Sequence, residues 1–253
     1  MHLNDTDQTR GYRTNLDLLL AAQKPARGTA AYSRLVNRPL ARYVAAAGAT
    51  VQMTPNQATV VSAFLSGTGI VLIAVMAPVW WSGIIVALLL AAGYVMDSVD
   101  GQLARLRGSG SKSGEWLDHT VDCFKTATLH LAVLIAWFRE PPVTGDFILL
   151  IPLGFEVVAT VTYFGLILMP TLRPAGSIGS ATGAESPLRK YVLLPTDYGV
   201  LCLAFVTFGT VLFPWIYGFL FLANAGSMVL ALRKWWIELR SLDSTVRGLP
   251  TEK

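Results

Sequence analysis

The chain has 253 residues, of which 53% are hydrophobic and 14% charged. Soluble domains carry about 25% charged residues, so this composition argues against a soluble domain and favours an integral membrane protein. The net charge of +4 is not taken as a sign of nucleic-acid binding, because basic residues beside apolar spans usually set orientation. Cys123 and Cys202 lie in apolar stretches and form neither a metal-ligand spacing nor a disulfide framework.

Residues 1–55 are predicted to form a cytoplasmic segment that ends in an amphipathic helix. Arg34, Arg38 and Arg42 recur every four residues and therefore share one helical face. Apolar side chains lie largely on the other faces, namely Leu35, Leu40, Tyr43 and Val44. We expect this helix to bend or begin at Pro39 and to lie in the membrane interface.

Six apolar blocks follow, each a candidate for a membrane-spanning helix of about 20 residues. They cover roughly 56–77, 79–105, 114–138, 146–169, 197–213 and 215–236. Thr54 and Pro55 predict the start of the first span, as N-cap and first helical residue. The sequence thus predicts an all-α membrane domain over 56–238 with six transmembrane helices, and a cytoplasmic tail over 239–253.

The basic residues predict the orientation of these spans. With the N-terminus inside, eighteen of the 20 Lys and Arg residues fall on the inner side. Arg139 alone falls outside, and Lys125 lies within a span. Because cytoplasmic loops are enriched in Lys and Arg, we expect a multi-pass protein of the cell (inner) membrane with both termini in the cytoplasm.

Four carboxylates mark the facing ends of the second and third spans. Asp97 and Asp100 are three residues apart, and Asp118 and Asp122 are four apart, so each pair shares a helix face. A short loop near 108–113 makes the two helices antiparallel neighbours. We therefore expect both pairs to converge at one membrane depth, on the cytoplasmic side.

Such a concentration of negative charge near hydrocarbon needs compensation. Divalent cations supply it, and hard carboxylate oxygens suit Mg²⁺ or Mn²⁺, which can in turn hold nucleotide phosphates. The alternative is that Arg105, Arg107 and Lys112 neutralise the cluster as ordinary ion pairs. Small residues at Gly101, Ala104 and Gly114 open a groove on the carboxylate face, although small residues also allow close helix packing.

The pattern Asp97-x2-Asp100-Gly101-x2-Ala104-Arg105-x8-Gly114-x3-Asp118-x3-Asp122 resembles the signature of the CDP-alcohol phosphotransferase (phosphatidyltransferase) family at every fixed position. The resemblance implies a six-span homodimeric enzyme of phospholipid biosynthesis with a cavity open to the cytoplasm. Its reaction transfers a substituted phosphate from a CDP-alcohol to an acceptor alcohol and releases CMP.

The resemblance also implies roles for the site residues. Asp97, Asp100 and Asp118 would be metal ligands, and two ions are expected. Asp122 would be the catalytic general base with a share in the second ion. The nucleotide-binding surface would comprise Asp97, Asp100, Gly101, Ala104, Arg105, Gly114 and Asp118.

The acceptor and the lipid part of the donor stay open. Candidate acceptor-binding residues are Arg38 and three residues of the loop after the fourth span, namely Arg173, Arg189 and Lys190. The segment 24–39 is similar to family members that make inositol-phosphate diesters, whereas 114–119 is similar to choline and ethanolamine phosphotransferases. Three alternatives remain: transfer from a soluble CDP-polyol, a divalent-cation transporter, and an inactive scaffold.

Overall fold

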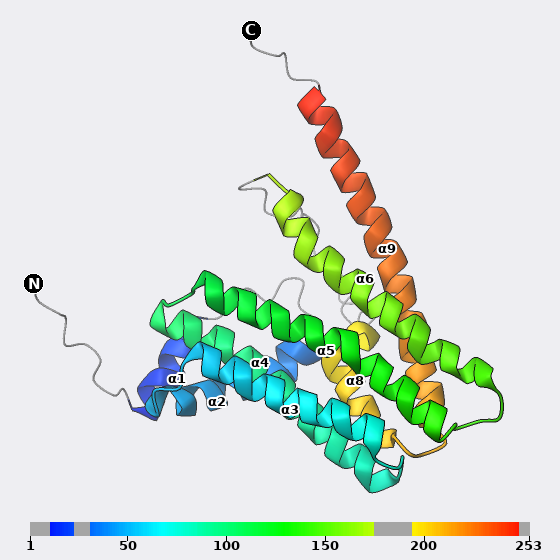
Figure 1. Cartoon of the computed structure of the whole chain (residues 1–253). Helices are drawn as coiled ribbons and strands as arrows, with labels where there is room; N and C mark the ends of the chain where they lie inside the picture. Colours follow the sequence, from blue (N-terminus) through cyan, green and yellow to red (C-terminus); the bar gives the residue numbers. More distant parts are fainter. Residues whose placement is uncertain (1–10, 23–30, 175–193, 248–253) are drawn as a thin grey trace, which may run out of the picture.

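The N-terminal part of the chain folds into short helices that pack on the bundle. The computed structural model describes residues 11–22, 31–174 and 194–247. Helix α1 spans Tyr12–Ala21, and the π-helical turn η1, Ser33–Asn37, continues into α2, Arg38–Thr50. Helices α1 and α2 contact each other and α4 (Figure 1). The predicted helix is thus present and carries Pro39 in its first turn, while its place in a membrane interface stays a prediction.

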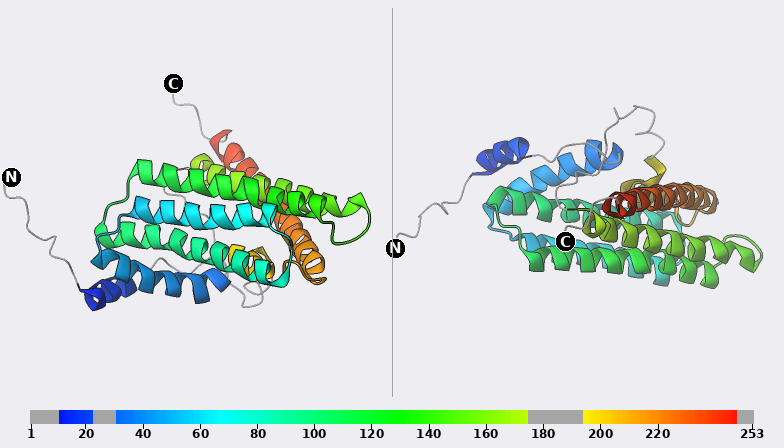
Figure 2. Two further views of the ribbon diagram at one scale, coloured as in Figure 1. Left: turned by 60° about the horizontal axis from the view of Figure 1, so that its bottom comes forward. Right: turned by 90° about the horizontal axis from the view of Figure 1, so that it is seen from above.

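Five helices are long and apolar enough to cross a membrane, which confirms an all-helical membrane protein among the described residues. They are α3 (Pro55–Val75), α4 (Trp80–Arg107), α5 (Lys112–Arg139), α6 (Leu150–Leu172, preceded by the 3-10 turn η2, Asp146–Leu149) and α9 (Phe213–Arg247). Helices α3, α4 and α5 lie side by side, and α6 links α5 to α9 (Figures 1 and 2).

The segment predicted as the fifth span, 197–213, is not one long helix. It forms α8, Tyr198–Ala204, and the 3-10 turn η4, Phe205–Thr207. Ten helical residues rise about 15 Å, half of the apolar thickness of a bilayer. The chain then turns at Gly209, whose φ of 81° suits glycine and which lies against the backbone of Pro78. The described helices support five spans, and the sixth stays a prediction.

Local sequence signals explain how the central helices begin and end. The Thr54 hydroxyl accepts a hydrogen bond from Gln57 N, and the Gln57 side chain accepts one from Thr54 N, so the predicted start of α3 is confirmed as a capping box. Helix α4 ends at Gly108, which has a φ of 60°. Ser111 then caps α5 by accepting from Gly114 N at 3.0 Å. This short connection makes α4 and α5 antiparallel, but α3 packs between them and contacts both, so the prediction that α4 and α5 are direct neighbours is wrong (Figure 2).

Two apolar clusters hold the bundle together. In one cluster, α2 packs on α4 through small side chains, together with Ala58 of α3; the alanines of α2 are Ala41, Ala45 and Ala46. Their small side chains allow α2 to approach closely. Aromatic residues fill the other cluster around α8, η4 and α9, including Phe205, Phe208, Phe213 and Tyr217. The carboxylates of α4 and α5 are therefore placed by a rigid arrangement of helices on both sides.

Candidate active site

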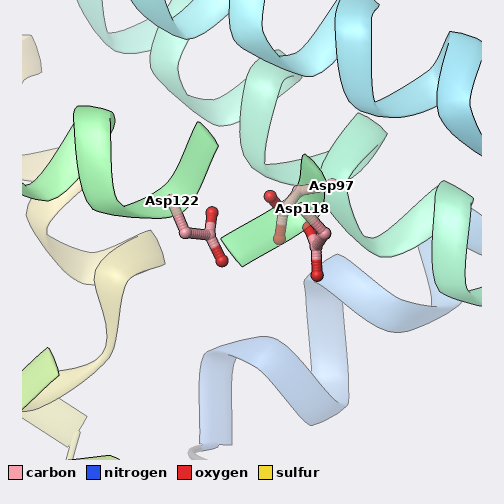
Figure 3. A group of neighbouring side chains, drawn as sticks. All are labelled: Asp97, Asp118 and Asp122. Carbon is pink, nitrogen blue, oxygen red and sulfur yellow. The ribbon is translucent and has the colours of Figure 1, made fainter. Parts of the chain in front are cut away.

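Three of the four predicted carboxylates meet. Asp97 projects from α4, and Asp118 and Asp122 project from successive turns of α5 (Figure 3). One oxygen of each carboxylate lies within 4.8 Å of the others. All three residues are partly buried. The i,i+4 spacing and the tight 108–111 connection bring them together, as the sequence predicts.

The fourth carboxylate, Asp100, lies outside this group and faces α3. It is buried, and its Oδ2 accepts a hydrogen bond from the Thr59 hydroxyl at 2.7 Å. Its Oδ1 accepts one from the backbone N–H of Gly101. These contacts fix the side chain one turn from Asp97. To serve as a ligand beside the other three, Asp100 would use the remaining lone pairs of its oxygens.

Lys125, which the sequence places within a membrane span, lies inside this group of carboxylates. Lys125 Nζ is 2.6 Å from Asp97 Oδ1 and 2.7 Å from Asp122 Oδ1. The side chain is buried. The signal that could have found it is its position three residues after Asp122, on the same face of α5.

A cavity of about 200 Å³ opens beside these charges. Its walls are Tyr94, Asp97, Asp122, Lys125, Thr126, Tyr163 and Tyr198. The Tyr163 hydroxyl donates to the His119 carbonyl at 2.6 Å, which fastens α6 to α5. A second cavity of about 170 Å³ shares three of these walls and extends along α5 to His130.

The segment before α3 lies close to the site. The Asn37 amide donates to Ser98 Oγ at 2.7 Å and to the Tyr94 carbonyl at 3.2 Å. Gln102, from α4, donates to the Arg38 carbonyl at 3.1 Å. The start of α2 is thereby held against the turns of α4 that carry the carboxylates. Sequence reasoning missed Asn37, because its partners lie about sixty residues away.

A second contact of this segment reaches α8. Ser33 N donates to Asp197 Oδ2 at 2.9 Å, and Asp197 also caps α8 by accepting from Gly199 N. Burial raises the pKa of the neighbouring Tyr32 hydroxyl, and nearby Cys202 and Asp197 raise it further. The N-terminal helices therefore bridge α4 and α8.

The residues predicted to bind nucleotide differ in their surroundings. A Cβ added at Gly101 would have only the Arg105 guanidinium within 4 Å, at 3.4 Å, so α4 is open beside this residue. Ala104 and Arg105 are half-buried beside it. A side chain at Gly114 would come within 3.0 Å of Asn56 Oδ1. Gly114 therefore allows α5 to start close to α3, which is the packing role left open above.

The candidate acceptor residues are not all free. Arg173 Nε and Nη2 donate to the two oxygens of Glu238 at 2.8 and 3.1 Å, which joins the end of α6 to α9. This hydrogen bonding raises the pKa of Arg173. Arg38 is half-buried near the site, whereas Arg189 and Lys190 lie outside the described residues.

The chemistry of the donor set fits a divalent cation. Asp97, Asp118 and Asp122 offer anionic oxygens close enough to share one ion, and Mg²⁺ and Mn²⁺ prefer such ligands. Among the described residues they form the one group of acidic, His or Cys side chains with this proximity. Within the described ranges, no such group includes Glu156 of α6.

Comparison with known proteins agrees with this geometry. Over 106 residues the chain is 33% identical to the archaetidylinositol phosphate synthase of Pyrococcus horikoshii. That match covers 40% of this chain and 53% of the relative, so the chain spans about half the length of the curated relative it matches. A model of CDP-alcohol phosphatidyltransferases matches residues 52–220, which include every carboxylate of the site. The chain therefore belongs to the CDP-alcohol phosphatidyltransferase family.

Proposed function

We propose that this protein transfers a substituted phosphate from a CDP-alcohol to the hydroxyl of an acceptor alcohol, with release of CMP. The observation that carries the proposal is the meeting of Asp97, Asp118 and Asp122 beside a cavity. Membership of the family supports the general reaction. The donor lipid, the acceptor and the metal dependence belong to the proposal.

The four carboxylates would have two roles in the transfer, ion binding and proton acceptance. Asp97, Asp100 and Asp118 would hold divalent cations, Mg²⁺ or Mn²⁺, and two ions are proposed. When bound, the ions neutralise the pyrophosphate and stabilise the CMP leaving group. The open face of α4 at Gly101 and Arg105 would receive the nucleotide.

Asp122 would act as the general base. It lines the cavity and lies one helical turn from Asp118. As the acceptor oxygen attacks the phosphorus that carries the alcohol, the bond from this phosphorus to CMP breaks and the hydroxyl proton passes to Asp122. The cavity wall of Tyr94, Tyr163 and Tyr198 would hold the acceptor in line.

The decisive experiment measures CMP release by the purified full-length protein. CDP-diacylglycerol and soluble CDP-alcohols are each offered with a panel of acceptors, in Mg²⁺, in Mn²⁺ and in chelator. The name of the Pyrococcus relative makes inositol phosphate the first acceptor to test, followed by choline and ethanolamine. Acceptor-dependent CMP release that chelator abolishes is expected. Ion transport without CMP release would support a divalent-cation transporter instead.

We also propose a cytoplasmic active site in the cell membrane and a homodimer. The orientation rests on the Lys and Arg asymmetry of the sequence. A single cysteine at Ser109, in a variant that lacks Cys123 and Cys202, should react with an impermeant maleimide only after the cells are opened. Labelling in intact cells would invert the topology. Cross-linking in native membranes tests the dimer.

A further inference from the structure

Lys125 is held by three different helices. Its Nζ contacts Asp97 of α4 at 2.6 Å and Asp122 of its own helix α5 at 2.7 Å. It also lies 3.5 Å from Ser62 Oγ of α3. The Ser62 hydroxyl is itself fixed, because it donates to the Gly93 carbonyl at 2.9 Å. The ammonium therefore has a defined position in the bundle rather than a choice of partners.

The charge balance around Lys125 is unusual for a structural ion pair. A buried lysine needs one carboxylate to avoid an uncompensated charge. Here one ammonium lies between two carboxylates, and a third, Asp118, is within 4.8 Å of both. Three ionised carboxylates and one ammonium leave an excess of negative charge. The cluster can therefore still attract a cation, but only where the ammonium does not already lie.

The ammonium also occupies ligand positions. It contacts one oxygen of Asp97 and one oxygen of Asp122, and these same side chains belong to the three-carboxylate group. A divalent ion that used both oxygens would have to displace Lys125. An ion bound between Asp97 and Asp118 would leave Lys125 in place. The ion and the ammonium would then repel each other, and this repulsion falls with distance.

We propose that Lys125 is a resident cation of the Asp97–Asp122 side of the site. It positions Asp122 and weakens the binding of a second divalent ion there, so that one ion binds tightly and the other weakly. This inference rests on the proposed function, because it concerns the same carboxylates. It assigns Lys125 as a positioning residue.

The test is a Mn²⁺ binding isotherm, measured by electron paramagnetic resonance on the full-length protein in nanodiscs without nucleotide. The wild type should bind one Mn²⁺ at least about tenfold more tightly than a second. In Lys125→Met the dissociation constant of the second Mn²⁺ should fall by about tenfold or more, since the competing positive charge is gone. Lys125→Arg retains the charge and should keep the wild-type ratio.

Lys234→Met is the matched control, because it removes the same charge from an exposed position on α9. It should leave the isotherm unchanged. If Lys125→Met does not fold, Lys125→Gln keeps a polar group that can hydrogen-bond the carboxylates and should show the same tightening. Two equal Mn²⁺ sites in the wild type would overturn the proposal, and so would an unchanged second constant in the folded Met or Gln variant.

This measurement is independent of the proposed reaction. A protein that fails to release CMP from any CDP-alcohol, yet shows the predicted isotherms, would refute the proposed function and keep the role of Lys125. A protein that catalyses the transfer, but whose Mn²⁺ binding does not depend on Lys125, would support the proposed function and refute the role of Lys125.

Discussion

Two polar clusters lie along α5, and they differ in how their buried polar groups are balanced. At one, Asp118, Asp122 and Lys125 meet Asp97 and leave an excess of carboxylates. At the other, His130 Nδ1 and the Tyr217 hydroxyl are 2.6 Å apart, with both side chains buried.

The polar groups of the second cluster are satisfied within the protein, whereas the first cluster keeps an excess of negative charge. His130 stacks on Phe155 with ring centroids 3.9 Å apart, and its hydrogen bond to Tyr217 needs no ion. Inside a membrane an unbalanced charge is costly, so it persists where it has a use. His130 and Tyr217 therefore hold α5, α6 and α9 together, whereas the carboxylate cluster keeps an excess charge that a ligand could balance.

The largest expected effect is the loss of a ligand carboxylate. Asp97→Asn, Asp100→Asn and Asp118→Asn should each weaken Mn²⁺ binding and lower CMP release by about 10³-fold or more, because the proposed ions would stabilise the transition state by several kcal/mol. Turnover and Mn²⁺ affinity are measured together. Asp146→Asn, at an exposed position before α6, is the control. A variant with normal turnover and normal metal dependence would remove that residue from the ligand set.

Asp122→Asn should separate binding from chemistry. Removal of a general base costs roughly 10²–10⁴-fold in rate. CDP-alcohol affinity and the tight Mn²⁺ site should survive, because Asp97 and Asp118 remain. Rapid-quench turnover and equilibrium binding are compared on one preparation. If both affinities fall together with the rate, Asp122 is chiefly a metal ligand and the base must be sought elsewhere.

Gly101→Leu should weaken nucleotide binding without unfolding the protein. A Cβ added there has only the Arg105 guanidinium within 4 Å, so we expect the bulk of a leucine to project into the proposed nucleotide groove. Overpacking costs about 1–3 kcal/mol, which corresponds to a loss of affinity on the order of tenfold or more. Gly67→Leu, which also enters open space but on α3, should bind nucleotide normally. Tight CDP-alcohol binding by a normally melting Gly101→Leu protein would exclude the groove.

Tyr217→Phe should have the smallest effect on catalysis and a clear effect on stability. It leaves the His130 nitrogen without its partner, which costs about 1–3 kcal/mol of unfolding free energy. Thermal unfolding in detergent should shift downward, while Mn²⁺ binding stays unchanged. Tyr43→Phe, at an exposed position on α2, should change neither. Loss of Mn²⁺ binding in Tyr217→Phe would show that the two clusters are coupled.

The sequence predicted the parts of this arrangement that depend on short spacings. The i,i+4 pair Asp118 and Asp122, the tight connection to α4 and the Thr54 cap are all set within a few residues. The rest depends on contacts between distant segments. Spacing alone cannot show that Asp100 turns to Thr59 on α3.

Contacts between distant segments also decide two further features. The i,i+3 spacing pairs Lys125 with Asp122, but only the packing of the bundle shows that Asp97 of α4 contacts Lys125 as well. The segment 197–213 reads as a continuous span because a local pattern does not show that Gly209 lies against the backbone of Pro78, far away in sequence. Both features come from packing rather than from local propensity.

The hydrogen bond from Ser33 to Asp197 forms late when the chain folds during its synthesis. These partners are 164 residues apart, so the first helices leave the ribosome long before α8 exists. Asn37 can find Ser98 as soon as α4 is inserted, but the connection to α8 must wait. A nascent chain arrested after α5 would thus carry all four carboxylates without the contact that joins the N-terminal segment to α8.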